Sequence, residues 1–308
     1  METLKLLIDT DPGVDDALAI LMAHRYADVL GLCIAAGNVG LRHTTGNALK
    51  LVETIGAATP VFAGCPTALV RAAEDAAFVH GADGFGDTGY TPSARAAERE
   101  HAAQAILRLS HEYAGTLVLV AIAPLTNLAL ALTLDPSLPQ RIARLVVMGG
   151  AVTGRGNTTT SAEFNVGFDP EAAHCVFSSW PQIELVDWEL CTRHAIEFAT
   201  VERWLAADNG QARFYAAISR KTRAWSRARG RPRLVVADAL ALAVALQPDI
   251  VTSAQERHVA IELDGKLTRG MTVVDWENRS GRAPNTRIAL DVDQARFEAL
   301  VETVFGAR

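Results

Sequence analysis

Four aspartates lie close together near the N-terminus, where they could bind a metal ion or take part in catalysis. They fall within eight residues, at Asp9, Asp11, Asp15 and Asp16. The cluster follows the first predicted strand, and ligands of open α/β sheets bind at that edge. The first turn of the next helix favours anions, which would explain Asp15 and Asp16 as capping residues alone. Repulsion among four carboxylates instead calls for a counter-ion, and a hard divalent cation has the right ligand preference.

The elements that would position this cluster alternate between strand and helix. Near-continuous apolar runs, typical of parallel strands buried on both faces, cover residues 4–8, 29–36, 60–64, 116–123, 144–150 and 183–187. Helical patterns separate them at 14–26, 44–56, 101–115, 126–134 and 169–180. Later strands are predicted at 258–265 and 287–293, with a terminal helix at 293–306. We predict one α/β domain over 1–308, with a wound, mostly parallel sheet flanked by helices.

Composition narrows the class of protein. The 29 Lys and Arg against 35 Asp and Glu give a net charge of −6, which offers no electrostatic basis for binding nucleic acid or an anionic membrane. No apolar run reaches the roughly 18 residues that a membrane span needs. The N-terminal apolar run is unlike a signal peptide, and the four cysteines are widely scattered, as in proteins of reducing compartments. We therefore expect a cytoplasmic protein.

Residues 9–17, DTDPGVDDA, resemble the N-terminal signature of the inosine-uridine-type nucleoside hydrolases. Further blocks follow in the order and spacing of that family: AGNVG (36–40), HGADGFGD (80–87), APLTNLALAL (123–132), VVMGGAVTGRGN (146–157), AEFNVGFDPEAA (162–173), ADALALAVAL (237–246) and GKLTRGMTVVD (265–275). They cover nearly the whole chain, and their combination is specific. The resemblance implies the nucleoside hydrolase fold, which is Rossmann-like, and a homodimer or homotetramer.

The resemblance also gives the acidic cluster a role. It implies one Ca²⁺ held by Asp11, Asp16, Asp238 and the backbone carbonyl of Ile122, an oxygen set that suits the flexible calcium shell. Asp11 would then be the general base that removes a proton from a calcium-bound water. Attack on C1′ of a nucleoside would pass through an oxocarbenium-like state in a single, inverting displacement.

Polar residues of the later blocks match positions that bind the sugar. By resemblance, Asp15 and Asn165 bind the ribose diol, while Asn157 and Glu163 lie on the 5′-hydroxyl side. Asn38 would orient Asp11 or the attacking water. Without the resemblance, the asparagines are typical of turns with left-handed backbone geometry, so both interpretations stay open at this point.

One position departs from the family pattern. The best-described members have a His or Trp that acts on the leaving base just before the C-terminal Asp ligand, whereas this chain has Ala237 before Asp238. Alanine has no proton to give, and a general acid is worth about 10² to 10⁴ in rate. His80 matches a pocket histidine of the family and could contact or protonate the base. Met148 ends a predicted strand and suits core packing and pocket lining equally.

Residues 213–233, here called the basic segment, contain eight Lys or Arg residues, no acidic residue, and Trp225. In the family the corresponding helix and loop cover the base pocket, so Trp225 could stack on a base. Arg223, Arg227 or Arg229 could stabilise the negative charge that develops on the base. A solvated helix followed by a basic loop is the alternative.

Two other motif matches are excluded by the sequence around them. GFGDTG (84–89) fits the glycine pattern of dinucleotide-binding folds but lacks the required strand before it and helix after it. The DTD triplet is also found in haloacid-type phosphatases, where the first Asp is the nucleophile. Here Asp9 precedes a Pro-Gly turn and an Asp pair that those enzymes lack.

The sequence thus predicts an enzyme that uses Ca²⁺ to hydrolyse the N-glycosidic bond of ribonucleosides, in nucleoside salvage or catabolism. Ala237 leaves two alternatives open. One is a ribose- or nucleoside-binding protein with weak turnover, and the other is a hydrolase for an unusual or modified nucleoside. The preferred base and the role of the basic segment are not determined by the sequence.

Overall fold

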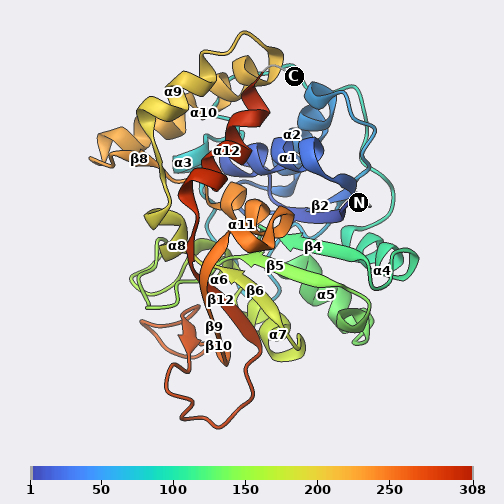
Figure 1. The fold of residues 1–308 in the computed structure, drawn as a ribbon. Coiled ribbons are helices and arrows are strands. Elements are labelled where there is room, and N and C mark those ends of the chain that lie inside the picture. The colour runs from blue at the N-terminus through green and yellow to red at the C-terminus, as the bar shows by residue number, and fades with distance from the viewer. Residues whose placement is uncertain (1–2, 307–308) are drawn as a thin grey trace.

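Eight strands form one sheet in the computed structural model, which describes residues 3–306 (Figure 1). They are β1 (Lys5–Thr10), β2 (Asp28–Ile34), β3 (Val61–Ala63), β4 (Leu117–Ala121), β5 (Arg144–Met148), β6 (Ile183–Val186), β9 (Val251–Arg257) and β12 (Thr286–Val292). Their order is β3-β2-β1-β4-β5-β6-β12-β9, and every neighbouring pair is parallel except β12 with β9. The predicted α/β architecture is confirmed.

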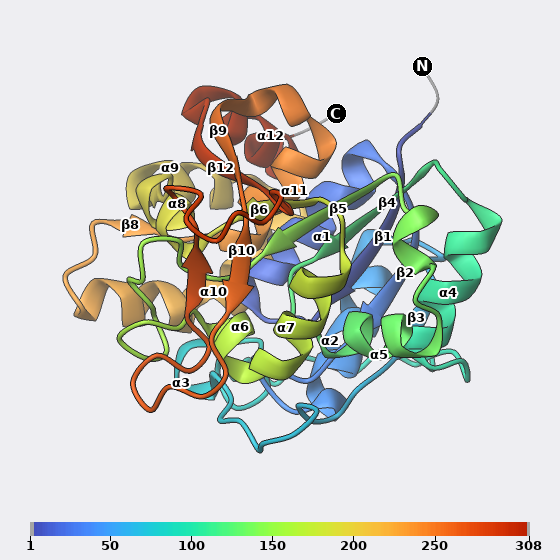
Figure 2. The same ribbon diagram turned by 90° about the horizontal axis from the view of Figure 1, so that it is seen from below.

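Helices cover both faces of this sheet. One face carries α1 (Val14–Tyr26), α2 (Leu41–Ile55), α10 (Gly210–Ala228), α11 (Ala237–Leu246) and α12 (Gln294–Phe305), and the other carries α4 (Ala102–Glu112), α5 (Thr126–Leu134) and α7 (Pro170–Ser179). Strand β1 shows how the faces divide, because Leu6 and Ile8 join the first core while Leu7 joins the second. Seen from below, α5 and α7 lie side by side (Figure 2).

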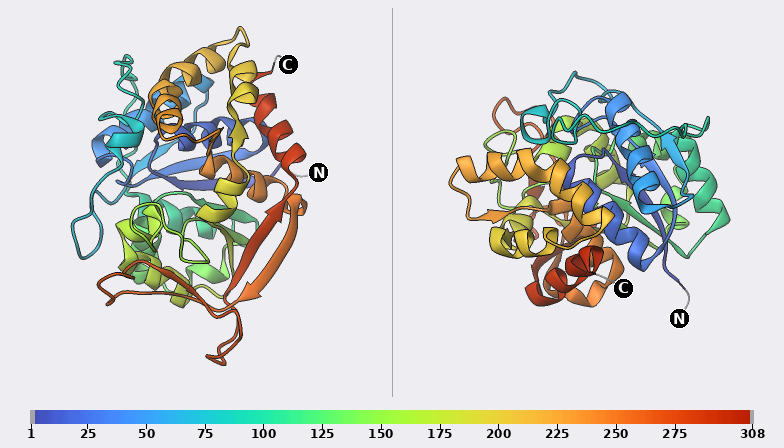
Figure 3. Two further views of the ribbon diagram at one scale, coloured as in Figure 1. Left: turned by 90° about the vertical axis from the view of Figure 1, so that its left-hand side faces the viewer. Right: turned by 90° about the horizontal axis from the view of Figure 1, so that it is seen from above.

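The remaining elements are short. They are the helices α3 (Ala77–His80), α6 (Phe164–Phe168), α8 (Trp188–Arg193) and α9 (Phe198–Leu205), and the strands β7 (Ile196–Glu197), β8 (Arg233–Leu234), β10 (Val259–Ile261) and β11 (Thr272–Val274). The chain around β10 and β11 extends from the end of the molecule opposite α9 and α10 (Figure 3). Within residues 3–306, no helix combines the length and apolar character needed to cross a membrane.

The prediction of elements was most accurate in the buried N-terminal half. Helices α1 and α5 have the predicted bounds of 14–26 and 126–134. The predicted strand at 258–265 is only partly formed, and its β10 portion pairs with β11 in a separate antiparallel ribbon. Edge strand β9 was not predicted, because its sequence VTSAQER is polar and solvent-facing and lacks the apolar run of a buried parallel strand.

Asp169 joins three segments on the second face of the sheet. Its Oδ1 accepts a hydrogen bond from the Ala172 amide at the start of α7, 3.0 Å away. Its Oδ2 accepts bonds from the Leu69 amide at 2.9 Å and the Thr126 hydroxyl at 2.7 Å. The carboxylate therefore caps a helix and satisfies two further donors in a fully buried place.

We expect Asp169→Ala to lower the free energy of unfolding by about 3 kcal/mol, because it removes one helix cap and leaves buried donors unpaired. Urea denaturation of both proteins measures the loss. The control is Asp293→Ala, which removes the half-buried cap of α12 and should cost about 1 kcal/mol. Equal losses in the two variants would show that the links to Leu69 and Thr126 contribute nothing.

Candidate active site

A cavity of about 360 Å³ lies at the carboxyl edge of the parallel strands. It is bounded by the segments that follow β1, β4 and β5 and by the first residues of α11. Most of the residues singled out from the sequence line it, namely Asp15, Asn38, His80, Ile122, Met148, Asn157, Glu163, Asn165, Trp225 and Asp238. Asp11 and Asp16 are fully buried and are not part of the cavity wall.

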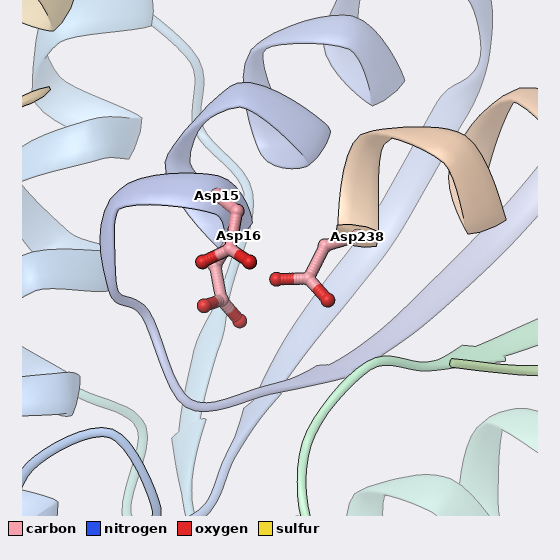
Figure 4. Close-up of side chains that lie close together, drawn as sticks. All are labelled: Asp15, Asp16 and Asp238. Carbon is pink, nitrogen blue, oxygen red and sulfur yellow. The ribbon is translucent and has the colours of Figure 1, made fainter. Parts of the chain in front are cut away.

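Three carboxylates converge beside the cavity, where the N-terminal ends of α1 and α11 meet (Figure 4), and two of them, Asp15 and Asp238, line its wall. Carboxylate oxygens of Asp15, Asp16 and Asp238 all lie within 4.8 Å of one another. The tightest group therefore contains Asp15, whereas the resemblance placed Asp11 among the metal ligands and Asp15 on the ribose. Asp11 is nevertheless close enough to raise the pKa of Asp238 by charge repulsion.

Hydrogen bonds from backbone and side-chain donors hold Asp11 and Asp16 in place. Asp16 accepts hydrogen bonds from the Thr10 hydroxyl at 2.6 Å and, at the other oxygen, from the Asn38 side-chain amide at 3.0 Å. The Asn38 backbone amide donates to Asp11 Oδ2 at 2.6 Å. Gly37 leaves the room for this contact, since a Cβ there would stand 2.1 Å from the same Asp11 oxygen. The AGNVG turn thus positions both aspartates.

The electrostatics of this group favour a cation. Burial and mutual repulsion raise the pKa of Asp11 and Asp238 well above their usual range, and burial raises the pKa of Asp15 to about 6. Asp11 Oδ1 and Asp15 Oδ1 are buried and have no hydrogen-bond partner among the described residues. Buried, unpartnered oxygens that repel one another fit the needs of a hard divalent cation, which would remove the repulsion. The residues present can therefore hold a metal ion.

Asp9, the first aspartate of the signature, lies apart from this group. Its Oδ1 accepts a hydrogen bond from the Asn127 side chain on α5, 2.8 Å away. Burial raises its pKa to about 7, and no other aspartate contributes to that shift. The expectation that all four N-terminal aspartates converge was wrong, because Asp9 shares the face of β1 that Leu7 and α5 occupy, whereas Asp16 lies on α1, which covers the opposite face.

His80 is a neutral histidine on the cavity wall. The Val14 backbone amide donates to His80 Nδ1 at 3.1 Å, so the proton of the neutral ring resides on Nε2. Burial lowers the pKa of His80 to about 4, although Asp15 Oδ1 lies 4.0 Å from Nδ1. Gly13 permits the approach, because a Cβ there would stand 2.6 Å from Nδ1. At neutral pH this ring can donate a hydrogen bond but is a poor source of a full proton.

Glu163 and Asn165 form another polar part of the cavity wall. Both oxygens of buried Glu163 accept backbone amides, from Asn165 at 2.9 Å and from Gly150 at 2.8 Å, while burial raises its pKa to about 7. The Asn165 side chain donates to the carbonyls of Ile122 at 3.1 Å and Met148 at 3.2 Å. Met148 thus packs in the core and also borders the cavity, so both interpretations of that residue hold.

The basic segment contributes only its inward-facing residues. Trp225, Arg229 and Arg231 line the cavity, together with Ala237. Arg223 bonds to its own helix at Ala216 O, and Arg227 forms an ion pair with Glu202 on α9, so neither reaches the cavity. The inclusion of these two arginines among the candidates was therefore wrong.

Sequence reasoning missed several cavity residues on α3 and α10. Tyr215 is buried beside the cavity, and its hydroxyl has no hydrogen-bond partner among the described residues. Thr222, Ser226 and Phe78 also line the wall. The helical spacing of 215, 222 and 226 was the available signal, since these positions share one face of α10.

Comparison with known proteins identifies the class. The sequence matches the family described as inosine-uridine preferring nucleoside hydrolase over residues 6–299. It is 39% identical over 298 residues to the non-specific ribonucleoside hydrolase RihC of Klebsiella pneumoniae, covering 96% of each chain. It is 36% identical to the inosine-uridine preferring nucleoside hydrolase of Crithidia fasciculata, again over 96% of each chain. A solved inosine-guanosine nucleoside hydrolase superimposes with a TM-score of 0.93 at 32% identity, over 99% of each chain.

Fold and sequence together define an enzyme of the N-glycosyl hydrolase class. The chain belongs to the inosine-uridine preferring nucleoside hydrolase family. The resemblance seen in the sequence is thereby confirmed.

We expect the neutral state of His80 to show in the pH dependence of stability. A histidine whose pKa is lowered by folding contributes stability above its unfolded pKa of about 6.5, and that stability is lost as the pH falls towards 4. Between pH 7 and pH 5, the free energy of unfolding of the wild type should fall by about 2 kcal/mol more than that of His80→Gln. Urea denaturation at both pH values measures the difference, and an unchanged gap between the two proteins would refute a buried neutral ring.

Proposed function

We propose that the protein hydrolyses the N-glycosidic bond of ribonucleosides to ribose and free base with the help of Ca²⁺, in nucleoside salvage or catabolism. The observation that carries this proposal is the carboxylate group at the floor of a cavity large enough for a small polar ligand. Ring-shaped polar substrates commonly bind in cavities of this size. The activities of the similar ribonucleoside hydrolases support the same reaction.

Asp11, Asp16, Asp238 and the carbonyl of Ile122 are the residues that we assign to the cation. All are oxygen donors, and Asp15 completes the same buried group. When bound, Ca²⁺ supplies Lewis-acid chemistry that makes water more acidic and neutralises the carboxylates.

Asp11 is the residue that we assign to accept the proton of the attacking water. The Asn38 amide holds one of its oxygens, and Oδ1 is unpartnered and free to act. A carboxylate held beside the attacking water is a suitable group to accept its proton. Attack on C1′ then expels the base and leaves the water's oxygen on ribose.

The other assigned residues bind and orient the nucleoside. Asp15 and Asn165 would bind the ribose diol, and the Asn165 amide is already held by two carbonyls near the floor. Asn157 and Glu163 would face the 5′-hydroxyl. The His80 Nε2–H would donate to the substrate, and the Trp225 indole would pack against the base.

Ala237 supports a second candidate function, that of a nucleoside-binding protein with weak turnover or a hydrolase for a modified nucleoside. Its methyl group lines the cavity where a proton donor would be useful. The unpartnered oxygen of Asp11 favours the enzyme, since a binding protein needs no base aimed at water. A cytoplasmic homodimer or homotetramer, as the sequence resemblance implies, remains part of the proposal.

A substrate panel tests the proposed reaction. Purified protein with Ca²⁺ should release ribose from common ribonucleosides and from p-nitrophenyl riboside. Asp11→Asn should lower kcat by about 10² to 10⁴-fold while nucleoside affinity largely survives, because the variant keeps the shape but loses the base. Asp9→Asn is the matched control, and it should stay close to wild-type kcat because Asp9 is bonded to Asn127 outside the cavity. Binding of nucleosides without any ribose release would favour the binding protein.

Calcium binding gives a separate prediction. Isothermal titration calorimetry of chelator-treated protein should show one Ca²⁺ site, and Ca²⁺ should raise Tm because it relieves the repulsion among buried carboxylates. Asp238→Ala should abolish the binding heat and the rise in Tm. Asp249→Ala, which alters an exposed aspartate paired with Arg296, should leave both unchanged. Retention of the calcium site in Asp238→Ala would contradict the assigned ligand set.

A further inference from the structure

Two guanidinium groups on the cavity wall have no acidic partner. Arg229 and Arg231 form no ion pair within residues 3–306. Other arginines of the basic segment are paired with carboxylates outside the cavity: Arg213 with Asp208, Arg227 with Glu202 and Arg233 with Glu197. Arg220 and Arg223 also have no acidic partner within residues 3–306, but neither lines the cavity. Arg229 and Arg231 are therefore the unpaired arginines at the cavity wall.

Trp225 holds both groups in place. The guanidinium carbon of Arg229 lies 4.0 Å from the Trp225 ring centroid, and that of Arg231 lies 5.1 Å from it. Stacking on an indole restricts a guanidinium and leaves its N–H donors free at the edges. Arg231 is half-buried, and burial together with the charge of Arg229 lowers its pKa. Two cations held side by side without a counter-ion are suited to bind an anion.

The carboxylates occupy a different part of the same cavity. Asp15 and Asp238 lie in the first turns of α1 and α11, whereas Arg229 and Arg231 follow the C-terminal end of α10. Neither arginine forms an ion pair with these carboxylates within residues 3–306. The cavity thus has an acidic part and a basic part. Heterolysis of an N-glycosidic bond generates positive charge on the ribose and negative charge on the base. The charge distribution of the wall matches that separation, with carboxylates for the sugar and guanidiniums for the base.

We propose that Arg229 and Arg231 are catalytic residues that bind the departing base as an anion, in place of the general acid that Ala237 cannot provide. This inference rests on the proposed hydrolysis. The C1′–N bond breaks and its electron pair leaves with the base, while water adds to C1′ and gives a proton to Asp11. The base anion then takes a proton from solvent and Asp11 returns its own to solvent, so that the products are neutral ribose and neutral base.

The inference makes the reaction depend on how well the base carries negative charge. A base with an exocyclic oxygen places that charge on an atom that guanidinium N–H groups bind strongly. Adenine, whose exocyclic group is an amine, gives these donors no exocyclic oxygen acceptor and departs more readily after protonation. The contribution of the two arginines should accordingly be large for inosine and small for adenosine. p-Nitrophenyl riboside, whose leaving group is already a stable anion, should need them little.

The test compares the Arg229→Ala/Arg231→Ala double variant with the wild type and with Arg227→Ala. Arg227→Ala removes a guanidinium from the last turn of α10, outside the cavity, and should behave as wild type. For the double variant we expect kcat/KM to fall about 100-fold on inosine, a typical effect of lost charge stabilisation, and less than about threefold on p-nitrophenyl riboside. Thermal melting checks that the double variant folds. If its Tm falls, Arg229→Gln/Arg231→Gln replaces it in the assay.

Each other outcome overturns the inference in a recognisable way. An unchanged kcat/KM on inosine would show that the arginines do not act on the base. Equal losses on inosine and p-nitrophenyl riboside would indicate general damage to the site. Cleavage of inosine 5′-monophosphate that depends on both arginines, at a higher kcat/KM than inosine, would make the pair a phosphate site. If the wild type released ribose from no substrate, including p-nitrophenyl riboside, the proposed hydrolysis itself would fail.

Discussion

Repulsion among buried carboxylates is the constraint on which the rest of the site depends. Asp11, Asp15, Asp16 and Asp238 are held together at one edge of the sheet, where burial raises the pKa of all four and mutual repulsion adds to the rise for Asp11, Asp16 and Asp238. The free-energy cost of burying these charges is partly offset by hydrogen bonds from the Thr10 hydroxyl and from backbone amides at the start of α1. What they leave unpaired are two buried oxygens, Asp11 Oδ1 and Asp15 Oδ1, in a group of carboxylates whose repulsion a bound cation would relieve.

The parallel sheet makes this arrangement possible. Strands β1, β4 and β5 end at the same edge, so the residues after β1 meet those after β4 and β5, which lie more than a hundred positions further along the chain. Helix α11 brings Asp238 to the same place from the C-terminal half. Small residues are required where the segments touch, and Gly37 shows why, because any side chain there would displace Asp11. The close approach of backbone and carboxylate therefore depends on glycine.

Acidic and basic side chains line separate parts of the cavity, and this separation explains how the site could work with Ala237 in place of a proton donor. A site that lacks a proton donor can still lower the barrier to bond cleavage if it stabilises the charge on both fragments. Carboxylates at the floor and guanidiniums stacked on Trp225 provide the two signs of charge in separate parts of one wall. His80 is held neutral by burial and fits this electrostatic design better than the role of a full acid.

The sequence by itself determined the class of fold, the family, and the local groups that carry chemistry, because apolar runs, turn residues and the DTDPGVDDA signature are properties of neighbouring residues. Only the tertiary structure decided which of these groups meet. It separated Asp9 from the other aspartates, since Asp9 lies on the face of β1 that α5 covers while α1 covers the opposite face, and it brought Tyr215 to the cavity through the orientation of α10. It also showed that Arg229 and Arg231, and not Arg223 or Arg227, line the cavity. Arg227 pairs with Glu202 on α9 and Arg223 bonds to its own helix, and such contacts depend on how the helix is oriented against its neighbours.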